Sequence, residues 1–86
     1  MLNVIFSEKF IEQFESLPQK TKILAEKKIA LFQADPRNPS LKTHKLHGAL
    51  REYLSFSVDH KTRIVFEYGT KSTIHFLKIG DHAIYR

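Results

Sequence analysis

The most strongly patterned segment of the chain is Arg63-Ile-Val-Phe-Glu-Tyr-Gly-Thr-Lys-Ser-Thr-Ile-His-Phe-Leu-Lys-Ile-Gly80. Two runs of β-branched and aromatic residues, 63–68 and 73–79, flank a turn signal at 69–72, which predicts an antiparallel hairpin. Antiparallel strands bring the start of the first strand beside the end of the second. Arg63 is therefore expected near the C-terminal residues 81–86, which include a histidine and a tyrosine. This group is a candidate site for holding a phosphate and moving a proton.

A further strand is predicted immediately before the hairpin. In the segment 52–58, Leu54, Phe56 and Val58 alternate with polar residues, as in a strand with one buried face. The segment 59–62 then turns the chain into the hairpin. We therefore expect a meander of three strands.

The N-terminal part predicts a strand and two helices. Residues 2–6 are apolar and β-prone, and Ser7 is a good cap for a helix whose apolar face repeats through Phe10, Phe14 and Leu17. Ser16 and Gln19 have the spacing of a capping box for a second helix. Its apolar stripe contains Thr21, Ala25, Ile29 and Phe32, and Asp35-Pro36 ends it.

A connector, residues 37–48, joins this helix to the meander, and Leu41 and Leu46 are expected to attach it to the core. The expected fold class is α+β. One small domain, residues 1–86, places an N-terminal strand and an α-helical hairpin on an antiparallel sheet, in the order β-α-α-β-β-β.

Composition narrows the classes of function. The chain has no cysteine, which excludes disulfides and cysteine-based metal sites. We expect no membrane span and no signal peptide, and therefore a cytoplasmic protein. Residues 1–35 have five lysines and five acidic residues, whereas residues 36–86 have nine basic and four acidic residues and account for the net charge of +5. A basic sheet favours an anionic ligand, nucleic acid above all, although a small domain can also be basic for no specific reason.

Four segments, in this order, resemble the RelE/ParE superfamily of toxin–antitoxin toxins. They are His44-Lys-Leu-His-Gly48, Tyr53-Leu-Ser-Phe-Ser-Val58, Arg63-Ile-Val-Phe66 and Ile79-Gly-Asp-His-Ala-Ile-Tyr85. The RelE, YoeB and YafQ branches look most similar. The resemblance implies a ribosome-dependent mRNA endoribonuclease (mRNA interferase) that inhibits translation by metal-free attack of the ribose 2′-OH on the adjacent phosphate. It also implies an acidic cognate antitoxin that folds on binding, with ribosome and mRNA as further partners and neither membrane nor small-molecule cofactor.

The resemblance also suggests catalytic roles. His82 lies where YafQ-like toxins have a catalytic histidine, which suits a general acid. Arg63 lies at the position of the family's strand arginine and would bind the phosphate in the transition state, the alternative being a salt bridge with Glu67 or Asp81. His44 matches a catalytic histidine of YafQ and is the candidate general base, with His47 as its competitor.

Other positions are assigned more broadly. Tyr85 would stack on a base or orient the phosphate, or else pack on the core as a C-terminal plug. The residues expected to bind the RNA backbone are Lys42, Lys45, His47, Arg51 and Arg86. His60 and His75 are interpreted as structural, and no metal site is expected.

The chain departs from the YafQ pattern at two positions. A further His and Asp of YafQ-like toxins correspond to Ser57 and Lys61. Two alternatives to the nuclease stay open: a ParE-like inhibitor of gyrase without nuclease activity, and a non-catalytic binding domain.

Overall fold

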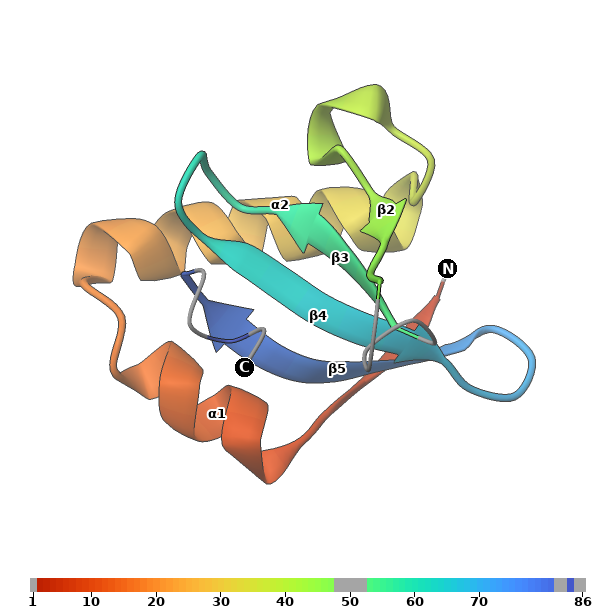
Figure 1. Ribbon diagram of the computed structural model, residues 1–86, viewed down its shortest axis with the longest axis horizontal. Coiled ribbons are helices and arrows are strands. Elements are labelled where there is room, and N and C mark those ends of the chain that lie inside the picture. Colours follow the sequence, from red (N-terminus) through yellow and green to blue (C-terminus); the bar gives the residue numbers. More distant parts are fainter. Residues whose placement is uncertain (1, 48–52, 82–83, 85–86) are drawn as a thin grey trace.

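The computed structural model describes residues 2–47, 53–81 and 84 and has the expected α+β architecture (Figure 1). Its elements are β1 (Asn3–Phe6), α1 (Glu8–Glu15), α2 (Gln19–Ala34), the 3₁₀ turn η1 (Pro39–Leu41), β2 (His44–Lys45), β3 (Leu54–Ser57), β4 (Arg63–Tyr68) and β5 (Thr73–Gly80). Both α-helices are too short or too polar to cross a bilayer in the part of the chain that is described.

The strands form one five-stranded sheet in the order β1-β5-β4-β3-β2. β1 runs parallel to β5, and the other neighbouring pairs are antiparallel. The predicted meander is confirmed, but the connector is not only a loop, because it contains η1 and the short strand β2. In Figure 1, α2 runs behind β3 and β4.

The core lies between the sheet and the helices and is built largely from phenylalanine. Phe32 of α2 stacks on Phe56 at 4.7 Å between ring centroids and meets Phe66 and Phe76 edge-on at 5.0 and 5.8 Å. All four side chains are fully buried. Such aromatic packing supplies much of the apolar burial available to a domain of this size.

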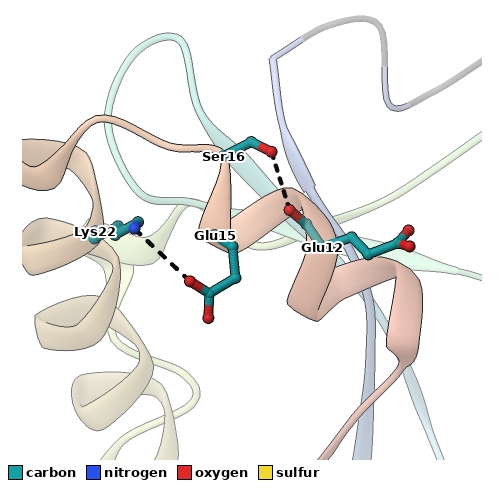
Figure 2. A network of polar contacts seen from close by, with 4 residues as sticks. All are labelled: Glu12, Glu15, Ser16 and Lys22. Atoms are coloured by element: carbon teal, nitrogen blue, oxygen red, sulfur yellow. Dashed lines mark hydrogen bonds and ion pairs between the residues drawn. The ribbon is translucent and has the colours of Figure 1, made fainter.

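The two predicted helix starts have different outcomes. Ser7 caps α1 as expected, because its Oγ accepts a hydrogen bond from the backbone N–H of Phe10 at 3.0 Å. The capping box predicted for α2 is wrong: Pro18 occupies the cap position without a side-chain bond. Ser16 instead donates its hydroxyl to the carbonyl of Glu12 at 3.1 Å, which ends α1 (Figure 2).

The expectation of one solvated face for β3 is also wrong. The helix side of β3 carries Leu54 and Phe56, but Ser55 and Ser57 on the opposite side are buried too. That opposite side, called the outer face below, carries Ser55, Ser57, Arg63, Val65 and Lys78. A second apolar cluster covers part of it and is formed by Leu46, Val65 and Ile84 with Tyr53 and Leu77.

α1 fixes the end of β5 beyond the point where β1 stops. Ser7 Oγ donates to the carbonyl of Leu77 at 2.9 Å, and Gln13 Oε1 accepts from the N–H of Ile79 at 3.0 Å. These side chains bond backbone groups of β5 beyond Phe76, the last residue of β5 that pairs with β1. The end of β5, which leads into the C-terminal segment, is thereby held in place.

Candidate functional site

Arg63 begins β4 on the outer face, at the centre of the sheet. Its Cα partners are Ser57 on β3 and Gly80 on β5. The expected closeness of Arg63 to the segment that follows Gly80 is therefore confirmed as far as Gly80. His82, Tyr85 and Arg86 lie outside the described residues, as does Arg51.

Backbone carbonyls of the preceding turn hold the guanidinium group of Arg63. Its Nη1 donates to the carbonyl of Asp59 and, at 3.3 Å, to that of Thr62. The salt bridge considered with Glu67 is not formed; Glu67 pairs instead with His75, with 3.5 Å between Oε2 and Nδ1. Among the described residues the guanidinium thus bonds neutral carbonyls and pairs with no carboxylate, so it can still attract an anion.

Asp59 shapes the turn that carries those carbonyls. Its Oδ1 accepts the N–H of Lys61 at 2.9 Å and that of Thr62 at 2.7 Å. Partial burial alone would raise the pKa of Asp59, but the hydrogen bonds from the backbone of Thr62 and Lys61 outweigh it and hold the pKa below its ordinary value. The sequence interpretation missed this residue, although an Asp at the start of a turn is a common signal.

His44 lies on the exposed edge strand β2, and its side chain shares the outer face. Its Cα partner is Ser55, which pairs in turn with Val65 of β4. From strand spacing and rise, the Cα atoms of His44 and Arg63 are roughly 12 Å apart. The two side chains flank a common region of the outer face without contacting each other.

A backbone carbonyl selects the tautomer of His44. Its Nδ1 lies 3.1 Å from the carbonyl oxygen of Lys42. A carbonyl can only accept, so Nδ1 carries the proton, and in the neutral ring Nε2 has a free lone pair. A neutral imidazole in this state can remove a proton from a hydroxyl group.

Lys78 is a further cation of this face that the sequence interpretation missed. It pairs with Val65 because the register between β4 and β5 shifts between Val65 and Phe66. At that shift, the side chains of β5 exchange the faces of the sheet to which they point. Strict alternation gives no sign of such a shift. Lys78 Nζ donates to the carbonyl of Ile84 at 3.3 Å, so this cation also contacts the C-terminal segment.

Ile84 anchors the C-terminal segment on the outer face. Its side chain is 7% exposed and packs with Leu46 and Val65. Gly80 makes room for it, because a Cβ at position 80 would lie 2.6 Å from Cγ2 of Ile84. Ile84 thus packs as an apolar plug on this face, while Tyr85, for which such a role was considered, lies outside the described residues.

The remaining site residues lie at the periphery. Lys42 has a left-handed backbone with φ of 51°, and Lys42, Lys45 and His47 are all exposed. Lys45 follows His44 in β2, and its side chain therefore points to the other side of the sheet. His60 is exposed in the β3–β4 turn. In the described part of the chain, His, Asp and Glu side chains nowhere gather in groups of three that could hold a metal ion.

Several solved structures with the same fold are toxins. Neither a protein-family model nor a curated protein sequence matches the chain. YafQ from Escherichia coli strain BL21(DE3) superposes with a TM-score of 0.79 at 16% identity, covering 99% of this chain and 98% of YafQ. The YoeB/ParE toxin from Agrobacterium tumefaciens superposes with a TM-score of 0.77 at 14% identity, covering 94% of this chain and 99% of that toxin.

A third neighbour is the E. coli DinJ-YafQ toxin–antitoxin complex, which matches with a TM-score of 0.76 at 17% identity and covers 96% of this chain and 94% of that chain. The structural neighbours agree with the resemblance that the sequence motifs suggested. At these identities the comparisons establish architecture. The chain therefore has the RelE-like α+β fold of the YafQ and YoeB/ParE toxins.

Proposed function

We propose that this chain is the toxin of a type II toxin–antitoxin system and cleaves mRNA on the ribosome in the cytoplasm. The observation that carries the proposal is the shared outer face of His44 and Arg63. His44 presents Nε2 as an acceptor, and Arg63 is held by carbonyls, with no carboxylate partner among the described residues. A base and a fixed cation on one surface suit attack on a phosphodiester.

The reaction follows from these roles. Nε2 of His44 removes the proton of a ribose 2′-OH, and O2′ forms a bond to the adjacent phosphorus. Arg63 stabilises the extra negative charge on the phosphoryl oxygens. The bond from phosphorus to O5′ breaks, and O5′ takes a proton from His82, leaving a 2′,3′-cyclic phosphate and a 5′-hydroxyl end. Proton exchange with water restores both histidines.

Further residues assist in this scheme. Lys78 is a second cation on the same face and donates to the carbonyl of Ile84. Tyr85 orients the phosphate or stacks on a base. Lys42, His47, Arg51 and Arg86 bind the RNA backbone, and His47 remains the alternative base. Lys45 would bind it from the edge strand, with its side chain on the helix side of the sheet.

A cognate antitoxin is part of the proposal. The DinJ-YafQ neighbour supports a protein partner of this kind. With a net charge of +5, the chain would attract an acidic segment that folds as it binds. Such a partner would cover the outer face and so prevent contact with RNA.

The test is primer extension on a reporter mRNA in a bacterial cell-free translation system. We expect new ends within translated codons with the wild-type protein, none without ribosomes, and none with Arg63→Ala or His82→Ala. His44→Ala and His47→Ala, compared side by side, decide which histidine is the base. Intact mRNA in the presence of folded wild-type protein would overturn the proposal, and DNA supercoiling by gyrase would then be measured.

A further inference from the structure

A hollow lies beside the edge of the sheet, between the connector that follows α2 and the end of β4. Its volume is about 360 Å³. The residues that line it include Pro36, Arg37, Asn38, Pro39, Lys42 and Tyr68. We propose that this hollow binds one nucleobase of a single-stranded RNA a few nucleotides from the cleaved bond, with the base stacked on Tyr68. The proposal rests on the proposed function.

Tyr68 supplies the stacking surface. It is 62% exposed, the highest value among the exposed large hydrophobic residues of the described part. Its ring meets Phe66 edge-on at 5.7 Å, which ties it to the buried core. A fixed, exposed aromatic ring is the usual platform for an unpaired base.

The charge of the hollow suits the phosphate of the same nucleotide. Arg37 and Lys42 are both exposed, and none of the lining residues is acidic. The nearby Asp35 carboxylate accepts a hydrogen bond from Asn38 Nδ2 at 3.2 Å. The carboxylates of an acidic peptide would satisfy the two cations but would not stack on the aromatic ring. A nucleotide carries both a phosphate and a flat base, so the combination favours a nucleotide.

The wall of the hollow is preorganised. Pro36 and Pro39 have restricted φ angles, and Asn38 Oδ1 accepts the N–H of Ser40 at 2.9 Å. Little conformational entropy is lost when a ligand binds to such a segment.

Lys42 connects the hollow to the outer face. Its side chain lines the hollow while its carbonyl holds His44 Nδ1, and its left-handed backbone turns the chain between the two. β2 is the last strand of the sheet, so an RNA strand that leaves the outer face at His44 can pass over this edge at Lys42. The hollow would then read a base outside the cleaved step and contribute to sequence preference.

The experiment uses a short single-stranded RNA with one thiouridine. We expect photo-crosslinking to yield an adduct on Tyr68 and Tyr68→Ala to weaken binding about 5- to 150-fold, the range for one stacked base. Tyr68→Phe keeps the ring and should bind within about twofold of wild type. Ile23→Ala, which removes an exposed hydrophobic side chain of α2, is the matched control.

The outcomes separate this subsite from the nuclease. Normal RNA affinity and cleavage in Tyr68→Ala, or adducts only elsewhere, would overturn the subsite and leave the nuclease intact. An adduct on Tyr68 in a wild-type protein that cuts no mRNA would support the subsite while the proposed nuclease fails. Weakened binding of an acidic peptide by Tyr68→Ala, with RNA binding unchanged, would also overturn it.

Discussion

The two faces of the sheet differ in what they contribute, although the same strands build both. On β4, Ile64 and Phe66 point to the helices and are fully buried, whereas Arg63 points to the outer face. The helix face is closed by stacked phenylalanines. On the outer face, the side chains of His44, Arg63 and Lys78 are held by hydrogen bonds to backbone carbonyls. We infer that stability depends mainly on the first face and activity on the second.

Phe32→Ala should have the largest effect and should act on stability. Removing a fully buried ring that contacts three other phenylalanines should cost about 3–5 kcal/mol of unfolding free energy, measured by urea denaturation. Ile23→Ala, on the exposed side of the same helix, should change it by less than about 0.5 kcal/mol. Equal effects of the two variants would contradict the assignment of the core.

Arg63→Ala should separate activity from stability. Loss of a fixed donor in the transition state should lower the cleavage rate about 10²- to 10³-fold. The unfolding free energy should fall by only about 1 kcal/mol, because the lost hydrogen bonds are partly exposed. Arg63→Lys keeps the positive charge but not the planar set of N–H donors of the guanidinium, and should rescue the rate only in part. If the unfolding free energy fell as strongly as the cleavage rate, the inferred division between a stabilising face and an active face would be contradicted.

Gly80→Ala tests the anchor of the C-terminal segment. Its Cβ would lie 2.6 Å from Ile84 Cγ2, so the segment must shift, at a cost of about 1–3 kcal/mol in unfolding free energy and with a clear loss of cleavage. Gly69→Ala is the control, because its nearest neighbour, at 3.0 Å, is the end of the His75 ring, which can move aside. Full activity in Gly80→Ala would show that the position of Ile84 does not matter.

Asp59→Ala tests whether the β3–β4 turn positions Arg63. Without the two backbone hydrogen bonds, the carbonyl of Asp59 should no longer hold the guanidinium, and kcat should fall about tenfold with KM little changed. Asp59→Asn keeps an acceptor oxygen and should restore most of kcat. An equal loss in both variants would instead assign the effect to the negative charge.

The smallest effect concerns pH and stability. Because the pKa of Asp59 lies below its ordinary value of 3.8, its contribution to stability is present above about pH 4 and is lost as the pH falls through the folded-state pKa. We expect the acid-induced decrease in the urea midpoint to be shallower in Asp59→Asn than in wild type. If the urea midpoints of wild type and Asp59→Asn depended on pH in the same way, Asp59 would not contribute to the loss of stability in acid.

Strong periodic signals made most of the fold predictable. The alternation in 54–58, the hairpin at 63–79 and the cap at Ser7 all have local causes, and each was confirmed in position. The predicted capping box at Ser16 was wrong because the Ser16 hydroxyl donates instead to the carbonyl of Glu12 in the preceding helical turn. β2 was missed because a strand of two residues has no period to detect.

The candidate site was predictable where it depends on strand pairing. Arg63 could be placed beside the end of the hairpin from the turn alone, and Gly80 is indeed its partner. Lys78 could not be assigned to the same face, because the register shift is a property of the paired strands. The bond between His44 and Lys42 depends on a left-handed backbone at a lysine, which is rare and has no local signal.

The sequence by itself determined the two helices and four of the five strands, the basic C-terminal half and the kinds of side chain available for chemistry. Periodicity and charge are local properties that can be read directly from neighbouring residues in the sequence. The tertiary structure alone decided that β1 pairs in parallel with β5, that Ser55 and Ser57 are buried, and that carbonyls of Asp59 and Lys42 hold Arg63 and His44. These features arise only when segments distant in sequence, or turns of unusual conformation, are fixed against one another by a common core.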